Sequence, residues 1–437
     1  MAVNRLAQRL PAALLALAAG APWHAAAAES LEEAWKLALS RDRTLAAAGF
    51  DVEGARVAEE AARSSRWPSL DAVGGYTHLN ASPALEVATP GSVLRSGPIF
   101  RDDQFVSGSV QLKLPLYTGG QISAGIAAAH QALVGISEEQ QSASASLKLD
   151  VAEAYVGVLR AQRALEAAQS SVASLTAHAD DVGHMVDREL VPRADALAAR
   201  VALANAEQAR VHAANALEIA QAAYNRRLGE PLERAPELEQ RIAADAFLGA
   251  ASLDQLLPRA LASRSELKAL AARVEALASQ AHVEAGKALP QLALTGAFTH
   301  FDNQILDRQD FSTVGVGFTW NLFDGGQAQH RAAALRSAGR AAQSRLEEAR
   351  SRIELEVRQA WLDVHEAQAR LRASGEAVSQ AEENLRSSRE LYGAGLATNT
   401  QVLEAVALRV SAINNHDNAA LDESLALLRL SYAVGAL

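Results

Sequence analysis

Histidine is the residue type in this sequence best suited to metal binding or acid–base chemistry, but its spacing supports neither use. His178 and His184 are six residues apart, which is the wrong separation for two ligands on one face of a helix, and no third ligand accompanies them. His365-Glu366 lacks the rest of a zinc-protease motif. We therefore predict no metal centre and no catalytic histidine.

Paired carboxylates and glycines offer no catalytic arrangement either. Glu32-Glu33, Glu59-Glu60 and Glu138-Glu139 fall in polar stretches of expected helix, where we interpret them as solvated side chains. Gly315-Val316-Gly317 lies in an expected strand and lacks the third glycine of a dinucleotide-binding loop. We predict that the protein is not an enzyme and uses no cofactor.

The composition excludes several classes of protein. The 437 residues match about three average domains. They carry 41 Lys+Arg against 51 Asp+Glu, a net charge of −10, so we expect no nucleic-acid partner. The absence of cysteine excludes disulfides, zinc–thiolate sites and thiol catalysis. Hydrophobic residues make up 49% but aromatic residues only 5%, which on composition alone favours a soluble, alanine-rich helical protein.

Residues 1–28 have the three parts of a secretory signal peptide. Two arginines begin the segment, residues 10–21 form its apolar stretch, and Ala26-Ala27-Ala28 provides small residues for cleavage before Glu29. The apolar stretch is well short of the roughly 20 residues of a spanning helix, which argues against a membrane anchor. Cleavage takes the net charge from −10 to −12, and the absence of cysteine rules out lipidation of the new N-terminus. Because no apolar run elsewhere reaches about 18 residues, any membrane crossing must use strands.

The sequence contains an internal repeat. Ser30-Leu31 recurs as Ser252-Leu253 at an offset of 222, whereas Gly119-Gly120 recurs as Gly325-Gly326 at an offset of 206. The difference of 16 residues indicates one insertion in the first copy. We therefore expect two structural repeats, at 29–229 and 252–437, joined by a linker at 230–251.

Each repeat is expected to contain a helical stretch, two strands and two long helices. The helical stretch ends at Trp67-Pro68 or Leu289-Pro290, because proline disfavours helix in the residue before it. The glycine pairs mark the exit from the strands. The expected bounds are helices at about 30–66 and 252–288, strands at about 69–79, 105–116, 291–301 and 311–323, and long helices at about 121–188, 193–228, 327–392 and 398–434.

The first long helix has the apolar spacing of a coiled coil. Its apolar residues follow three- and four-residue steps almost throughout, with one repeated four-residue step at Leu147 that alters the supercoil locally. A single exposed helical hairpin is an alternative, but the small alanines favour several helices packed side by side. The seam consists of Ile126, Ala129, Leu133, Ile136, Ala143, Leu147, Val151, Ala154, Val158, Ala161, Leu165, Ala168, Val172 and Leu175.

The expected strands alternate between apolar and polar residues. The pattern is cleanest at 105–116 and 311–323, weaker at 291–301 and weakest at 69–79. Each run has about ten residues, which is the length of a tilted transmembrane strand, although a half-buried strand of a soluble sandwich has the same periodicity. The apolar positions of the two clean runs are Val106, Gly108, Val110, Leu112, Leu114 and Leu116, and Val314, Val316, Phe318, Trp320 and Leu322.

Four strands are too few to close a barrel, and lipid tolerates no open sheet edge. Three copies in a symmetric trimer would supply twelve strands and close a wide barrel. Tyr117, Trp320 and Phe323 gather at the Gly-Gly end of the strands, where we expect the aromatic residues of a membrane interface. The loops at the other end, about 80–104 and 302–310, would then face the outside.

These features resemble a known family, the TolC-like outer membrane efflux channels. The resemblance rests on Leu-Pro-Leu-Tyr-Thr-Gly-Gly at 114–120, Trp-Asn-Leu-Phe-Asp-Gly-Gly at 320–326 and Ser-Leu-Glu-Glu-Ala-Trp-Lys-Leu-Ala-Leu at 30–39, and it covers residues 29–437. It implies a mostly α-helical fold with membrane β structure, in which a homotrimer combines a 12-stranded β-barrel in outer membrane lipid with a long coiled-coil α-barrel in the periplasm. It also implies a passive exit duct of a tripartite efflux or type I secretion system, with a periplasmic adaptor protein and an inner-membrane pump (proton-driven or ABC) as partners.

The resemblance assigns roles to the two turns between long helices. Leu190-Val191-Pro192 and Gly395-Leu396-Ala397-Thr398 look like the family's adaptor-docking tips. Proline and glycine break the helices there, and exposed Leu and Val suggest a contact surface. Two ordinary helix-hairpin turns are the alternative.

The family also implies a periplasmic gate beside the second tip. The acidic side chains that narrow the tunnel in family members fall, by position, on Gln401 and Glu404. Three copies of Glu404 would form a carboxylate ring that concentrates cations, whereas Gln401 leaves one ring without charge. Without the resemblance, Glu404 would be interpreted as an exposed helix carboxylate.

One competing class is a periplasmic coiled-coil adaptor or structural protein without a membrane barrel. Adaptors share the signal peptide and the long hairpins, but they lack four alternating strands with paired Gly-Gly exits. The residues favour neither small-molecule efflux nor protein secretion, because the pump upstream selects the substrate.

Overall fold

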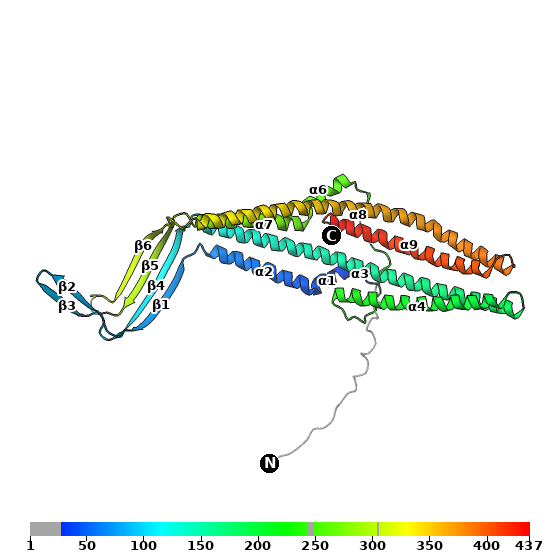
Figure 1. Ribbon diagram of the computed structural model, residues 1–437, viewed down its shortest axis with the longest axis horizontal. Coiled ribbons are helices and arrows are strands. Elements are labelled where there is room, and N and C mark those ends of the chain that lie inside the picture. Colours follow the sequence, from blue (N-terminus) through cyan, green and yellow to red (C-terminus); the bar gives the residue numbers. More distant parts are fainter. Residues whose placement is uncertain (1–27, 243–248, 304–305) are drawn as a thin grey trace, which may run out of the picture.

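The computed structural model describes residues 28–242, 249–303 and 306–437. The molecule is elongated, with a four-stranded antiparallel sheet at one end and long helices that run away from it (Figure 1). The predicted fold, mostly helical with four antiparallel strands in one sheet, is confirmed. Within the described ranges, every helix is too short or too polar to cross a membrane.

The sheet pairs the four alternating strands so that apolar residues of neighbouring strands lie opposite one another. Its strands are β1 (Ser69–His78), β4 (Gln104–Tyr117), β5 (Gln291–Phe301) and β6 (Asp310–Thr319), paired in the order β1-β4-β5-β6. Leu70 lies opposite Leu112, Leu114 opposite Leu294, and Leu294 opposite Val316. Because residues directly opposite in an antiparallel pair share a face, the four strands form one continuous apolar face.

The strand predicted at 311–323 is too long, because β6 ends at Thr319. The indole Nε1 of Trp320 donates to the carbonyl of Ala288 (3.1 Å), outside the sheet. The carboxylate of Asp324 accepts from the N–H groups of Gly326 and Ala328 (2.8 Å each), where the next helix begins. Residues 320–326 therefore belong to the connection between sheet and helix.

The loop predicted at 80–104 contains a β-hairpin, β2 (Ala84–Thr89) and β3 (Ser92–Pro98). Pro90 and Gly91 form its two-residue turn, in which Gly91 has a φ of +102°. At its base, Phe100 stacks on Phe105 with ring centroids 4.1 Å apart. Tertiary anchoring of this kind is not visible in a stretch rich in proline and glycine, which predicts only an exposed loop.

The helical stretches predicted at 30–66 and 252–288 are each broken once. The first divides into α1 (Leu31–Arg41) and α2 (Arg43–Ser64), the second into α6 (Leu253–Ser263) and α7 (Ser265–Gly286). Asp42 and Arg264 adopt extended backbone at the breaks, with ψ of 123° and 119°. The Asp42 carboxylate then accepts from the N–H of Leu45 (2.7 Å), which starts a new helix.

The long helices are α3 (Gln121–Asp187), α4 (Arg193–Leu228), α8 (Gln327–Gly393) and α9 (Asn399–Ala433). Every residue of the predicted seam on α3 is buried or half-buried. Residues outside the seam, such as Tyr155 and Val182, are buried as well, because α3 packs against α2, α4, α7 and α9. The packing is therefore that of several neighbouring helices and not of an isolated hairpin.

The first glycine pair makes a close contact that the second lacks. Gly119 has a φ of +60°, and a Cβ there would lie 2.6 Å from the Gly286 carbonyl oxygen and 2.8 Å from the Leu289 Cβ. Gly325 has a similar φ of +68°, but a Cβ there would meet nothing within 4 Å. We expect Gly119→Ala to lower the thermal midpoint clearly more than Gly325→Ala, whose cost is the backbone strain of about 1 kcal/mol that both variants share. Equal midpoints by circular dichroism would show that this junction tolerates a side chain.

Candidate functional site

Three aromatic residues lie where the sheet meets the helices. A β-bulge between Pro115 and Tyr117 places Tyr117 opposite Leu292, on the apolar face, whereas uninterrupted alternation would place it on the polar face. Trp320 and Phe323 are exposed in the connection after β6. The structure thus puts all three predicted interface aromatics at the same end of the sheet.

The two turns between long helices lie at the end of the molecule farthest from the sheet (Figure 1). In both turns, the helix before the turn ends in the same way. Glu189 and Gly395 adopt left-handed backbone, with φ of 59° and 75°, and the next residue donates its N–H back to the helix. That next residue is Leu190 (68% exposed) in one turn and Leu396 (77% exposed) in the other. Both turns therefore present an exposed leucine.

The other predicted tip residues start the following helices. Pro192 has the N-cap position of α4, and Val191 before it is half-buried against the apolar cluster at the tip. Thr398 is the N-cap of α9 in a capping box with Gln401, whose Oε1 accepts from the Thr398 N–H (2.8 Å). The spacing Thr-x-x-Gln is a local sequence signal of this capping box.

The two predicted gate residues differ in environment. The Gln401 side chain is turned toward the start of its own helix by the capping box. Glu404, one turn further along α9, is exposed and forms no hydrogen bond or ion pair with the described part of the chain. Only Glu404 thus presents a free charged group to its surroundings.

A polar network, unforeseen from the sequence, joins the four long helices next to the turns. His178 Nε2 on α3 lies 2.7 Å from Asn399 Oδ1 on α9, and both residues are buried. Asn399 Nδ2 donates to the carbonyl of Asp195 on α4 (3.0 Å). The hydroxyl of Tyr392 on α8 donates to the Asp195 carboxylate (3.2 Å). We call His178, Asp195, Tyr392 and Asn399 the tip network.

The donors and acceptors of the tip network are fixed by their partners. The Asp195 carbonyl can only accept, so the Asn399 amide must direct its nitrogen there and its oxygen toward His178. His178 therefore carries a proton on Nε2. Burial and the charge of Asp195 raise the pKa of Tyr392 to about 12, so its hydroxyl remains a donor at neutral pH. The network holds the α3/α4 hairpin to the start of α9.

Two of the histidines share one environment, although their spacing is the wrong separation for one face of a helix. His178 and His184 both line one cavity of about 500 Å³ beside the tip network, in spite of their six-residue spacing. In the described ranges, no group of three or more His, Asp or Glu residues could hold a metal ion. His365 Nδ1 lies 2.8 Å from the carbonyl of Trp361, one turn earlier in its own helix.

Two of the carboxylate pairs are not simply solvated. Glu59 is buried, and its carboxylate contacts Arg63 (2.6 Å) and His130 (3.3 Å). The hydrogen bond from Arg63 lowers the pKa of Glu59. Glu33 belongs to the capping box of α1 with Ser30. These contacts are structural, since each carboxylate either pairs with a cation or caps a helix.

The sequence profile of the outer membrane efflux protein family matches residues 34–230 and 256–436. The chain belongs to this family. Its membership places it among transport proteins and not among enzymes. The match also leaves the periplasmic adaptor alternative without support.

Two relatives of this outer membrane efflux protein span nearly all of its chain. The alkaline protease secretion protein AprF of Pseudomonas aeruginosa is 27% identical over 422 residues, which cover 93% of this chain and 84% of the relative. The outer membrane protein TolC of Vibrio cholerae is 24% identical over 419 residues, which cover 94% of this chain and 91% of the relative. The similarity therefore includes the strands, the long helices and both turns.

Solved structures of the same fold agree with the architecture. The outer membrane protein VceC from Vibrio cholerae superposes with a TM-score of 0.79 at 19% identity, covering 93% of this chain and 96% of that one. The Campylobacter jejuni CmeC outer membrane channel gives a TM-score of 0.78 at 15% identity, covering 94% and 86%. At such identities the likeness concerns the fold.

Proposed function

We propose that three copies of this chain form a passive channel across the outer membrane and the periplasm, the exit duct of a tripartite efflux or type I secretion system. The observation that carries the proposal is the sheet, in which apolar residues in register cover one face of all four strands. Polar residues such as Gln111, Lys113 and Thr295 share the other face. An apolar face suits lipid, and a polar face suits a water-filled lumen.

The trimer is supported by the edges of the sheet. β1 and β6 each have one neighbouring strand in the sheet, so each leaves one side unpaired within the chain. Lipid tolerates no unpaired edge, and pairing β6 of one copy with β1 of the next satisfies both. Three copies then give twelve strands. Tyr117, Trp320 and Phe323 would lie at the periplasmic boundary of the lipid.

The periplasmic part of the proposed duct is formed by the long helices. α3 and α8 have 67 residues each, roughly 100 Å at 1.5 Å per residue, which reaches far from the membrane. The exposed turns at their ends, with Leu190, Val191, Pro192, Gly395, Leu396 and Thr398, are the proposed docking sites for a periplasmic adaptor. An inner-membrane pump, proton-driven or ABC, would supply the energy and select the substrate.

The proposed gate lies beside the second docking turn. Glu404 would contribute three carboxylates to a ring, and Gln401 would contribute an uncharged layer one turn closer to the tip. The tip network supports this role, because it fixes the start of α9, the helix that carries both residues, against the other hairpin. Movement of α9 would require these hydrogen bonds to break.

The chain is also proposed to consist of a signal peptide, two duplicated units and a linker between them. Residues 1–28 would be removed as a signal peptide, residues 29–229 and 252–437 would be duplicated units, and 230–251 would join them. Duplication is supported by helices of equal length (α3 and α8) and by breaks at Asp42 and Arg264, 222 residues apart. The β2–β3 hairpin lies within the region of the insertion.

A pair of lysine substitutions tests which face of the sheet meets lipid. Val316→Lys places a charge on the apolar face and is expected to cost about 2–4 kcal/mol at the middle of a bilayer. Thr313→Lys places the same charge on the polar face of the same strand and should be tolerated. The measurement is the amount of detergent-extractable, heat-modifiable trimer in the outer membrane fraction. Recovery of the parent protein in soluble form without detergent would contradict the proposed channel.

A further inference from the structure

The residue after the proposed signal peptide is built into the middle of the helical body. The Glu29 N–H donates to the carbonyl of Glu237 (2.7 Å), and the Glu29 carbonyl accepts from the N–H of Glu239 (3.1 Å). Glu29 thereby forms a parallel β-bridge with Leu238. Ala28, immediately before it, is exposed. The Ala28–Glu29 bond thus separates an exposed residue from one whose backbone N–H and carbonyl are both hydrogen-bonded.

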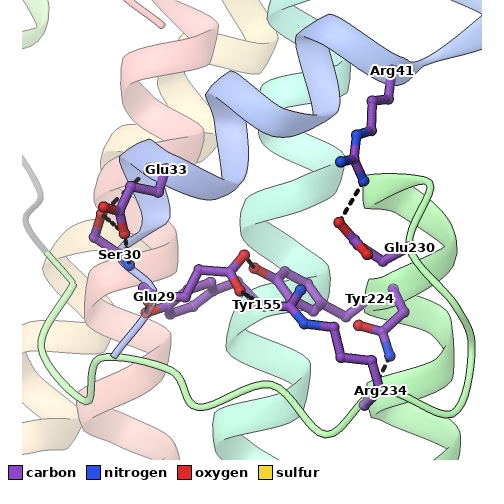
Figure 2. Close-up of polar contacts among 9 residues, drawn as sticks. Glu29, Ser30, Glu33, Arg41, Tyr155, Tyr224, Glu230 and Arg234 are labelled. Atoms are coloured by element: carbon purple, nitrogen blue, oxygen red, sulfur yellow. Dashed lines mark hydrogen bonds and ion pairs between the residues drawn. The ribbon is translucent and has the colours of Figure 1, made fainter. Parts of the chain in front are cut away.

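The side chain of Glu29 is held as firmly as its backbone. The hydroxyl of Tyr224 on α4 donates to Glu29 Oε1 (2.8 Å), and Arg234 pairs with Glu29 Oε2 (Figure 2). The hydroxyl of Tyr155 on α3 donates to the Glu29 carbonyl (2.8 Å). The two tyrosines are 1% and 0% exposed, with ring centroids 5.9 Å apart. One residue therefore connects α1, α3, α4 and the segment after α4.

The segment that receives Glu29 is acidic. Residues 230–239 contain four glutamates and one arginine. Arg234 pairs with Glu29 and Glu230 pairs with Arg41, but the remaining glutamates of the segment, including Glu237 and Glu239, form no ion pair within the described part of the chain. A positive group placed at the Glu29 nitrogen would complement this charge.

We propose that signal-peptide removal is also a folding step, in which hydrolysis of the Ala28–Glu29 bond creates an N-terminus that binds between α3, α4 and residues 230–239. Water adds across the peptide bond, so that Ala28 leaves with a carboxylate and Glu29 gains an α-amino group. An α-amino group has an ordinary pKa of about 8 and is mostly protonated at neutral pH. The ammonium keeps the contact with the Glu237 carbonyl and adds two donors toward the acidic segment. The inference rests on the proposed function only in taking residues 1–28 as a leader.

The first test is the identity of the mature N-terminus. Intact mass and N-terminal peptide mass of the protein extracted from outer membranes are expected to show Glu29 as the first residue. A chain that begins at Ser30 or later would lack the bridging carboxylate and would overturn the inference, as would a chain that retains residues 1–28. The readout is independent of pore formation, so a protein that starts at Glu29 but forms no channel would contradict only the proposed function.

The second test is the stability that Glu29 provides. Glu29→Ala is expected to lower the thermal midpoint of the extracted protein by roughly 5 °C, since it leaves Arg234 and the Tyr224 hydroxyl without their partner. Glu32→Ala is the matched control, because Glu32 lies three residues away, is exposed and has no partner within the described ranges. Equal midpoints for the two variants would overturn the inference.

The third test concerns the new amine itself. In the folded protein, acetylation of the Glu29 α-amino group by acetic anhydride is expected to be slower by at least about tenfold than in the urea-unfolded protein, because the docked group is protected until the structure opens. Mass spectrometry of the N-terminal peptide measures the extent. Equal rates in the folded and unfolded protein would show that the amine is free, and would overturn the docking step.

Discussion

The double variant Tyr392→Phe/Asn399→Ala is expected to raise the ratio of open to closed channels by about 150-fold, because it removes three hydrogen bonds worth about 1 kcal/mol each. The first substitution deletes the donor to the Asp195 carboxylate, and the second deletes the amide that links His178 to the Asp195 carbonyl. All three bonds hold the α3/α4 hairpin to the α8/α9 hairpin. Single-channel recording in planar bilayers measures the open fraction directly.

The control for this variant is a hydrogen bond that does not join the hairpins. Ser374 on α8 contacts His416 on α9 (3.2 Å), within a single hairpin. Ser374→Ala should leave the open fraction of the channel unchanged. If the double variant and Ser374→Ala gave the same open fraction as the parent, the tip network would have no part in gating.

Glu404→Gln is expected to abolish most of the cation preference of the channel. The substitution removes three carboxylates from one ring of the trimer while it keeps the size and the helix propensity of the side chain. Reversal potentials in a salt gradient across a planar bilayer give the ratio of cation to anion permeability. A ratio equal to that of the parent would remove Glu404 from the gate.

Gln401→Glu provides the opposite change at the neighbouring position. Glutamate can replace glutamine in the capping box with Thr398, so the start of α9 should keep its geometry. Three added carboxylates should then increase the cation preference of the channel. The increase is expected to be smaller than the loss in Glu404→Gln, because the capping box directs the new charge toward the helix N-terminus.

The fold was largely predictable because its elements have strong local signals. Two-residue alternation over runs of about ten residues identified the four strands of the sheet, and the coiled-coil spacing identified α3. The register was not predictable, since it depends on which strands pair. The β-bulge at Pro115–Tyr117 was likewise not predictable. It moves Tyr117 to the apolar face, and the alternation of residues along the strand does not signal it.

The tip network and the Glu29 site show why polar contacts escape prediction. His178 and Asn399 are 221 residues apart, and Glu29 is 195 residues from Tyr224. Neither pair has a local spacing that indicates contact, because each contact arises from the packing of segments that are far apart in the sequence. The capping boxes at Ser30 and Thr398, in contrast, are local and could have been identified from Ser-x-x-Glu and Thr-x-x-Gln.

Trimeric closure of the sheet is tested most directly by cross-linking its two edges. The native chain has no cysteine, so one cysteine in place of Gly74 on β1 can be combined in turn with one at each of positions 312–316 on β6. If β6 of one copy pairs with β1 of the next, at least one combination brings the two Cβ atoms to disulfide distance, about 4 Å. Oxidation in outer membranes should then give a covalent trimer on denaturing gels. Monomers alone at every position would contradict the proposed barrel.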